Sequence, residues 1–301
     1  MEPWILVTFA AVIAQTARFA LQKALSGGGG LSAAGATFSR FVWSFPLAAL
    51  AMVAYAQVSG QGGAGLTVPF WAYAMTGGLA QILATVCVVT LFRHRNFAVG
   101  ITFKKTEVIL AVLVSLVVLG EGVSLPAFGA ILLGLVGVLM LSDPPDGAGA
   151  WHRRIWNRAA GLGLASGLLF GISGVGYRGA SLALAEGDAG LRALTTLSFV
   201  TLFQTLAMLP WLLAREPGEI GRVFAAWRVT ALVGITSVIG SGCWFLAFTL
   251  ESVGLVKAVG QSELILSLLV SWLIFGERIS ARELAGMAVL SASILALILL
   301  H

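Results

Sequence analysis

Long apolar runs, separated by short polar or Gly- and Pro-rich breaks, are the dominant pattern of this chain. The hydrocarbon core of a bilayer is about 30 Å thick, and a helix needs roughly 20 apolar residues to cross it. The pattern therefore predicts an all-α integral membrane protein with ten transmembrane helices. These helices are expected at residues 4–25, 33–57, 69–91, 97–119, 125–141, 159–184, 190–214, 229–250, 253–275 and 281–300.

The longest polar break lies in the middle of the chain, at residues 142–158, where Asp143-Pro144-Pro145-Asp146 precedes Arg153-Arg154. Prolines next to Gly and Asp mark a loop rather than a helix. The break predicts two domains, residues 1–146 and 147–301, with five helices in each. The 301 residues leave no room for a large soluble domain.

The two halves repeat each other in sequence. A shift of 156 residues places the segment 107–124 on the segment 263–280, and Glu107 falls on Glu263. Because each half has an odd number of helices, the second copy must enter the membrane from the opposite side. We therefore expect two inverted five-helix repeats, an arrangement that many transporters use around a central binding site.

Charge differs strongly between the loops that join the predicted helices. Among the even-numbered loops only Arg192 is basic, whereas the odd-numbered loops carry ten arginines. Positively charged loops stay in the cytoplasm, so we expect both termini outside a bacterial inner (plasma) membrane. The odd-loop arginines are Arg93, Arg95, Arg153, Arg154, Arg158, Arg215, Arg222, Arg228, Arg278 and Arg282.

Composition supports the membrane interpretation and excludes several functions. Hydrophobic residues make up 58% of the chain and charged residues 10%, with a mean hydropathy of +0.97, whereas about 25% of a soluble domain is charged. The net charge of +5 is spread over short loops, which argues against a nucleic-acid partner. Cys87 and Cys243 lie inside apolar runs and act as small hydrophobes. We expect no disulfide framework, no metal site and no cofactor.

Paired turns carry a family resemblance. Leu119-Gly120-Glu121 and Phe275-Gly276-Glu277 each follow an apolar helix and precede a Gly-containing last helix. This arrangement resembles the EamA-type repeat of the drug/metabolite transporter superfamily, over nearly the whole chain. The resemblance implies a ten-helix transporter that alternates between two sides, with a cavity lined by helices one, three, four, six, eight and nine. It implies no particular substrate, since similar members export amino acids, move nucleotide-sugars or exchange sugar phosphates.

Two glutamates are the foremost candidates for function. Glu107 and Glu263 each lie about ten residues into a predicted helix, which puts them near the bilayer midplane. A charged side chain at that depth costs roughly 2.5–3.5 kcal/mol even on a lenient scale, so each needs a cavity or a partner. Each carboxylate is interpreted either as a titratable or substrate-facing group or as half of a structural ion pair.

Spacing along the helices predicts which charges share a face. Lys104 and Glu107 are three residues apart and Lys257 and Gln261 are four apart, so each pair can meet, whereas Lys257 and Glu263 are six apart and cannot readily do so. The two repeats are therefore not electrostatic copies.

Polar stripes at helical spacing predict cavity walls. The first helix carries one that includes Gln15 and Arg18, and the sixth carries one that includes Ser173 and Tyr177. A shift of 160 residues places Arg18 on Arg178. Gly163, Gly167 and Gly171, at steps of four, are interpreted as a packing ladder. We hypothesise two gates that close by pairing with Glu107 or Glu263: Arg18, Arg40, Lys104 and Lys105 on the cytoplasmic side, and Arg178 and Lys257 on the outside.

Within the spans, positive charges outnumber negative ones, which favours a substrate with a carboxylate or another anionic group. The leading interpretation is a monomeric secondary transporter that exports a small polar or amphipathic metabolite, an amino acid or organic anion, by alternating access. A proton-coupled exporter of organic cations or drugs, and a passive channel, remain alternatives.

An intramembrane enzyme is the remaining alternative. Gly171-Ile172-Ser173-Gly174 is similar to the Gly-x-Ser-Gly sequence of rhomboid proteases. A nucleophilic serine needs a base, but His94, His152 and His301 lie in loops or at the terminus. The chain is therefore not expected to be an enzyme.

Overall fold

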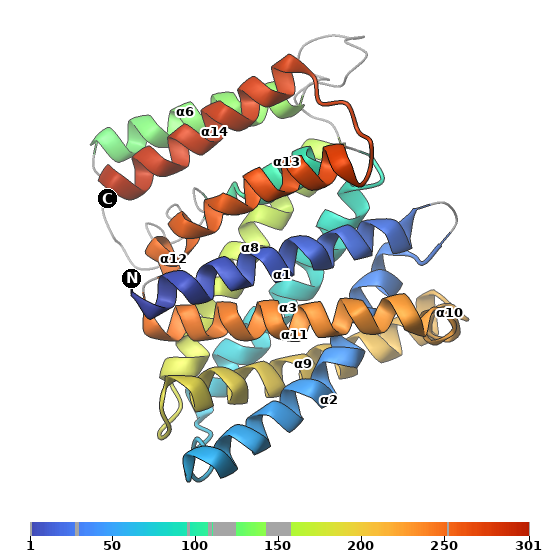
Figure 1. Cartoon of the computed structure of the whole chain (residues 1–301), viewed down its shortest axis with the longest axis vertical. Coiled ribbons are helices and arrows are strands. Elements are labelled where there is room, and N and C mark those ends of the chain that lie inside the picture. The colour runs from blue at the N-terminus through green and yellow to red at the C-terminus, as the bar shows by residue number, and fades with distance from the viewer. Residues whose placement is uncertain are drawn as a thin grey trace.

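The computed structural model describes residues 2–27, 30–94, 97–107, 110, 125–142, 158–251 and 253–300. Within these ranges the protein consists of helices and the turns that join them, with no β-strand (Figure 1). The helices are α1 (Pro3–Ser26), α2 (Ala33–Ser59), α3 (Val68–Leu91), α4 (Phe97–Lys104), α6 (Leu125–Ser142), α8 (Arg158–Leu182), α9 (Ala189–Arg215), α10 (Glu219–Ala225), α11 (Trp227–Leu250), α12 (Val253–Val259), the 3₁₀ turn η1 (Gly260–Ser262), α13 (Glu263–Leu273) and α14 (Ala281–Leu300).

Most of the predicted spans correspond to one helix each. Six of the helices in the described part, namely α1, α2, α3, α8, α9 and α11, are long and apolar enough to cross a membrane. Apolar helices α6 and α14 also lie where spans were predicted. The short helix α10 was not predicted, because it falls within the polar loop between two spans.

Local signals define several helix ends. The Ser32 hydroxyl accepts a hydrogen bond from the Gly35 amide at 2.8 Å and so caps α2, and an Asp188 carboxylate oxygen accepts one from the Leu191 amide at 2.8 Å and caps α9. Both residues satisfy amides that a helix start leaves unpaired. Gly60 ends α2 with φ of 65°, a conformation that favours glycine.

Glycines let the central helices approach closely. α3 packs against α8, and a Cβ on Gly176 would lie only 2.9 Å from the Cα of Gly77. Small residues at such a crossing allow backbone contact inside a membrane. Around this pair, α1 packs on α11, α2 packs on α9, and α6 and α14 lie side by side at one edge of the molecule (Figure 1).

The spans predicted at 97–119 and 253–275 are not continuous helices in the described part. α4 ends at Lys104, residues 105 and 106 form a turn, and the chain is helical again at Glu107. In the second half the break is η1, and α13 begins at Glu263. Neither span contains proline, and the apolar residues on both sides of each break predicted one helix across it. That prediction was wrong, and the breaks fall at the short polar stretches Lys105-Thr106 and Gly260-Gln261-Ser262.

The freed backbone groups at the second break find partners inside the protein. The Gly260 carbonyl accepts a hydrogen bond from Lys105 Nζ at 2.5 Å. A Cβ on Gly260 would lie 2.8 Å from the Trp244 ring, so a larger residue at this position would have to displace that ring. Irregular backbone at membrane depth is stable only when protein groups satisfy it in this way.

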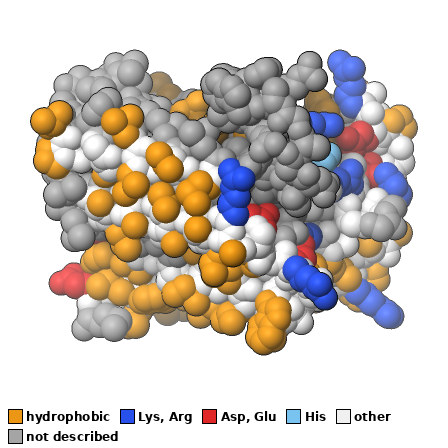
Figure 2. All heavy atoms as spheres, turned by 90° about the horizontal axis from the view of Figure 1, so that it is seen from above, with side chains coloured by type: hydrophobic (Ala, Val, Ile, Leu, Met, Phe, Trp, Pro, Cys, Tyr) orange, Lys and Arg blue, Asp and Glu red, His pale blue; other side chains and the backbone are white. Residues whose placement is uncertain are grey.

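The two ends of the helical bundle differ in charge. α1 begins and α14 ends at the same end (Figure 1), and the described loop arginines lie mostly at the other. Figure 2 shows lysine and arginine side chains gathered mainly at that other end, with hydrophobic side chains over much of the remaining surface. Arg95, Arg153 and Arg154 lie outside the described residues.

Candidate functional site

The two candidate glutamates form ion pairs that cross between the halves of the chain. Lys257 Nζ lies 2.9 Å from Glu107 Oε2, and Lys104 Nζ and Lys105 Nζ each lie 2.8 Å from Glu263 Oε2. All five side chains are buried. Each carboxylate therefore has its cation on an element of the other half.

This arrangement corrects the pairing expected from spacing. Lys104 was expected to meet Glu107 along one helix face, but its ammonium group lies on Glu263. The physical reason is the break after Lys104, because a three-residue spacing aligns side chains only in a continuous helix. The side chain of Gln261, expected to meet Lys257, lies outside the described residues.

Glu263 has the more complete set of partners. Besides the two lysines, Gln15 Nε2 donates a hydrogen bond to Glu263 Oε1 at 3.0 Å. The residue is fully buried and begins α13, where the helix dipole favours negative charge. Within the described part of the chain, Glu107 forms an ion pair with Lys257 alone.

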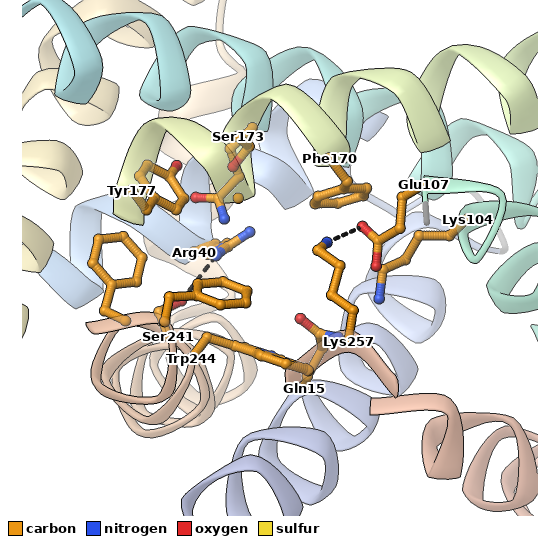
Figure 3. A pocket seen from close by; sticks show the side chains of 14 residues that line it. Gln15, Arg40, Lys104, Glu107, Phe170, Ser173, Tyr177, Ser241, Trp244 and Lys257 are labelled. Atoms are coloured by element: carbon orange, nitrogen blue, oxygen red, sulfur yellow. Dashed lines mark hydrogen bonds and ion pairs between the residues drawn. The ribbon is translucent and has the colours of Figure 1, made fainter. Parts of the chain in front are cut away.

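A cavity of about 40 Å³ lies beside these ion pairs (Figure 3). It has room for only a few water molecules, so a metabolite requires a wider conformation. The walls come from α1, α2, α3, α4, α8, α11 and α12, together with Glu107. The lining residues are Gln15, Arg40, Gln81, Lys104, Glu107, Phe170, Ser173, Gly174, Tyr177, Ser241, Trp244, Phe245, Phe248 and Lys257.

Arg40 enters the cavity wall from α2, a helix that the family resemblance did not include. Its side chain is buried and donates hydrogen bonds to three hydroxyls: Nε to Ser237 at 2.9 Å, Nη1 to Thr85 at 3.2 Å and Nη2 to Ser241 at 2.9 Å. The gate hypothesis paired Arg40 with a glutamate, whereas its partners in the described residues are these hydroxyls.

Tyr177, the aromatic residue predicted on the polar stripe of the sixth span, does line the cavity. Its ring stacks on Phe245 with centroids 4.2 Å apart, and Gln204 Nε2 donates to its hydroxyl at 3.3 Å. Sequence reasoning did not select Gln81, Trp244 or Phe245 as cavity residues. A glutamine in an apolar span was the available signal for Gln81, but an aromatic residue in a span more often packs or faces lipid.

Two predicted gate arginines lie away from the cavity lining. Arg18 is buried, donates to Gln22 Oε1 at 2.7 Å and lies 4.0 Å from the Phe19 ring centroid. Arg178 Nη1 donates to the Phe248 carbonyl at 2.5 Å and to the Glu251 carbonyl. These carbonyls belong to the end of α11, where helix carbonyls lack partners. Neither arginine forms an ion pair with Glu107 or Glu263 in the described part.

A second charged contact joins the halves at the basic end of the bundle. Lys23 on α1 forms an ion pair with Glu277, which follows α13. Its ammonium lies 4.8 Å from the Phe275 ring centroid, and the Phe97 amide donates to Glu277 Oε2 at 2.9 Å. This group of side chains, called the Lys23–Glu277 contact below, ties α1 to α4 and to the turn after α13.

The described residues contain no group of three or more His, Cys, Asp or Glu side chains able to hold a metal ion.

Comparison with known proteins identifies similarity to one sequence family. Residues 157–299 match the EamA-like transporter family. No curated protein is significantly similar to the chain. One solved crystal structure superposes with a TM-score of 0.63 at 16% identity, over 97% of this chain and 95% of its own. At that identity the likeness shows a shared fold alone.

Proposed function

Because the chain belongs to the EamA-like transporter family of the drug/metabolite transporter superfamily, and is a multi-pass membrane protein, we propose a substrate class and a transport mechanism for it. The protein is a monomeric secondary transporter for a small polar or amphipathic metabolite, an amino acid or organic anion. It exports this substrate by alternating access.

The charge of the site is the observation that carries the proposal. Five cations, Arg18, Arg40, Lys104, Lys105 and Lys257, and two carboxylates, Glu107 and Glu263, are buried within the bundle. Of these, Arg40, Lys104, Lys257 and Glu107 line the cavity. Taking a charge out of water is unfavourable unless an opposite charge compensates it. An excess of buried positive charge beside a cavity therefore favours a substrate with an anionic group.

The proposed architecture is two inverted repeats of five helices, residues 1–146 and 147–301. Its support is the position of the helix breaks: the turn at residues 105–106 and η1 fall on each other under the same shift of 156 that places Glu107 on Glu263. Paired broken helices at the midplane are typical of inverted-repeat transporters. The family match covers the second of these halves.

We further propose a bacterial inner (plasma) membrane location with both termini outside. α1 begins and α14 ends at one end of the bundle (Figure 1), and lysine and arginine side chains gather mainly at the other end (Figure 2). Basic loops favour the cytoplasm.

The crossed ion pairs suggest how access alternates. Lys257 with Glu107, and Lys104 and Lys105 with Glu263, each join elements of the two halves. Opening the cavity requires the halves to move apart, so at least one of these sets must dissociate. The gates in this scheme are the crossed lysines, with the Lys23–Glu277 contact closing the basic end.

Counterflow in liposomes tests the proposal. Liposomes that contain the purified protein are loaded in turn with an amino acid, an organic anion or an organic cation. Uptake of the same labelled compound is then measured with and without a pH gradient. Saturable exchange of an anion or zwitterion that is stimulated from the opposite side supports a carrier. Absence of saturable exchange for every compound, or single-channel currents, would reject it.

A proton-coupled exporter of organic cations is the second candidate, because Glu107 lines the cavity. In the same assay this function requires cation flux that follows the proton gradient and is lost in Glu107→Gln. Flux independent of the gradient in both proteins excludes it.

A further inference from the structure

Arg40 differs from the other cations of the cavity because it has no carboxylate partner in the described part of the chain. Lys257 has Glu107, and Lys104 has Glu263. Arg40 is 3% exposed, and its guanidinium contacts three neutral hydroxyls. Hydroxyls satisfy hydrogen bonds but supply no opposite charge, so a buried cation remains uncompensated.

The hydrogen bonds of Arg40 leave part of its donor set available. A guanidinium has five N–H donors, and the three hydroxyls use one each on Nε, Nη1 and Nη2. One N–H therefore remains on each of the two terminal nitrogens. These two N–H groups can donate to the oxygens of a carboxylate, the anion that a guanidinium binds most strongly through charge-assisted hydrogen bonds.

Trp244 provides a second, independent sign of a missing acceptor. Its indole Nε1 is buried and has no hydrogen-bond partner among the described residues, and the side chain lines the same cavity as Arg40. A buried N–H without an acceptor is unfavourable, so a ligand oxygen beside it would satisfy it.

Aromatic rings make up most of the apolar wall. Tyr177 stacks on Phe245, and Trp244 stacks on Phe248 with centroids 5.5 Å apart. Figure 3 shows Arg40 and Tyr177 toward one end of the cavity, and Glu107, Lys104 and Lys257 toward the other. An anionic head at Arg40 would thus have an apolar surface next to it.

Resting on the proposed function, we propose that Arg40 is the anion subsite of the transporter and binds the carboxylate of the substrate. The indole N–H of Trp244 donates to the same carboxylate or to another oxygen of the substrate beside it. The substrate is a monocarboxylate with an apolar or aromatic body, which packs against the aromatic rings.

The test compares three carboxylates with their neutral amides on the purified full-length protein in detergent. The probes are 3-phenylpropionate, indole-3-propionate and 4-methylvalerate, and binding is measured from the ligand-dependent rise in Tm. At least one carboxylate is expected to bind about 10- to 100-fold more tightly than its amide, as hydrogen bonds to charged groups give. Equal binding of acid and amide in all three pairs overturns the proposal without any mutant.

Variants then assign the preference to residues. Arg40→Gln is expected to lose the preference for acid over amide, and Arg40→Lys to retain part of it. Trp244→Phe keeps a ring but removes the N–H, and is expected to weaken carboxylate binding about 2- to 10-fold. If Arg40→Gln does not fold, the Arg40→Lys result and the wild-type comparison still decide the matter.

Arg178→Gln is the matched control, because Arg178 also donates to neutral oxygens within the bundle but does not line the cavity. It is expected to keep the full preference for acid over amide. An unchanged preference in folded Arg40→Gln overturns the proposal, and so does a loss in Arg178→Gln equal to that in Arg40→Gln. Saturable counterflow of any compound in that case still supports the transporter, whereas its absence for all compounds rejects the function itself.

Discussion

Lys257 Nζ and Glu107 Oε2 lie 2.9 Å apart, although one belongs to α12 and the other follows the break after α4. The reciprocal contact joins Lys104 and Lys105 to Glu263. Each half of the chain therefore supplies a carboxylate for the other half's cations. Any motion that separates the halves exposes or rearranges these charges.

Removing one member of the Lys257–Glu107 pair should be more harmful than removing both. Glu107→Gln leaves a buried ammonium without a counter-ion, and we expect a loss of about 3 kcal/mol in stability. The double variant Glu107→Gln with Lys257→Gln should recover most of it. Thermal unfolding in detergent provides the double-mutant cycle. Additive losses in the double variant would show that the two groups are not coupled.

The Glu263 cluster should respond asymmetrically. Lys104→Gln or Lys105→Gln leaves Glu263 with the other lysine and with Gln15, whereas Glu263→Gln leaves two buried ammonium groups close together. We expect each lysine variant to lower Tm less than Glu263→Gln does, because like charges repel in a low dielectric. Equal losses in all three variants would contradict the geometry.

Gly167 on α8 packs directly against the first helix break. A Cβ there would lie 3.0 Å from the Glu107 amide nitrogen, whereas a Cβ on Gly161 of the same helix meets nothing within 4 Å. Gly167→Ala should therefore reduce stability by about 1–3 kcal/mol through overpacking, and Gly161→Ala should be neutral or slightly stabilising. Thermal unfolding of both variants checks this. A neutral Gly167→Ala would mean that the break can move away from α8.

The Lys23–Glu277 contact should control access from the basic end. In a cysteine-free background with Ser173→Cys as a reporter in the cavity wall, Glu277→Gln removes the partner of Lys23. We expect faster labelling of the reporter by an impermeant thiol reagent added at the basic end. Labelling from the opposite side is the control and should not increase. Unchanged labelling from both sides would assign the contact to stability alone.

Asp188 should make the loop before α9 sensitive to acid. The pKa of Asp188 lies below its ordinary value, chiefly because the Leu191 amide donates to it. Burial acts in the opposite direction, and hydrogen bonds from Gln61 and Tyr55 lower the pKa further. A depressed pKa gives stabilisation that is complete above the unfolded pKa, about 3.9, and is lost as the pH falls through the folded value.

Asp188→Asn keeps a capping side chain but removes the charge. The wild type should therefore have the higher Tm near about pH 6, and the difference should shrink on acidification below about pH 4. The effect is small because Asp188 is exposed. A difference between the proteins that grows on acidification would refute the assignment.

The sequence alone determined the class of this protein, the position of most helices and the candidate charges. Apolar length is a local property of the chain, so eight of the predicted spans could be identified without any tertiary contact. A charge in an apolar run also needs no contact to be recognised as costly. Glu107, Lys104, Lys257 and Arg40, all selected this way, line one cavity.

Only the tertiary structure decided which groups are partners. Spacing predicted that Lys104 meets Glu107, but the helix ends between them, and an apolar run does not reveal where a helix breaks. Arg18 and Arg178 were expected at gates, yet one donates to Gln22 and the other to carbonyls at the end of α11. Ion pairs and hydrogen bonds reach only a few ångströms, so the packing of distant segments determines them.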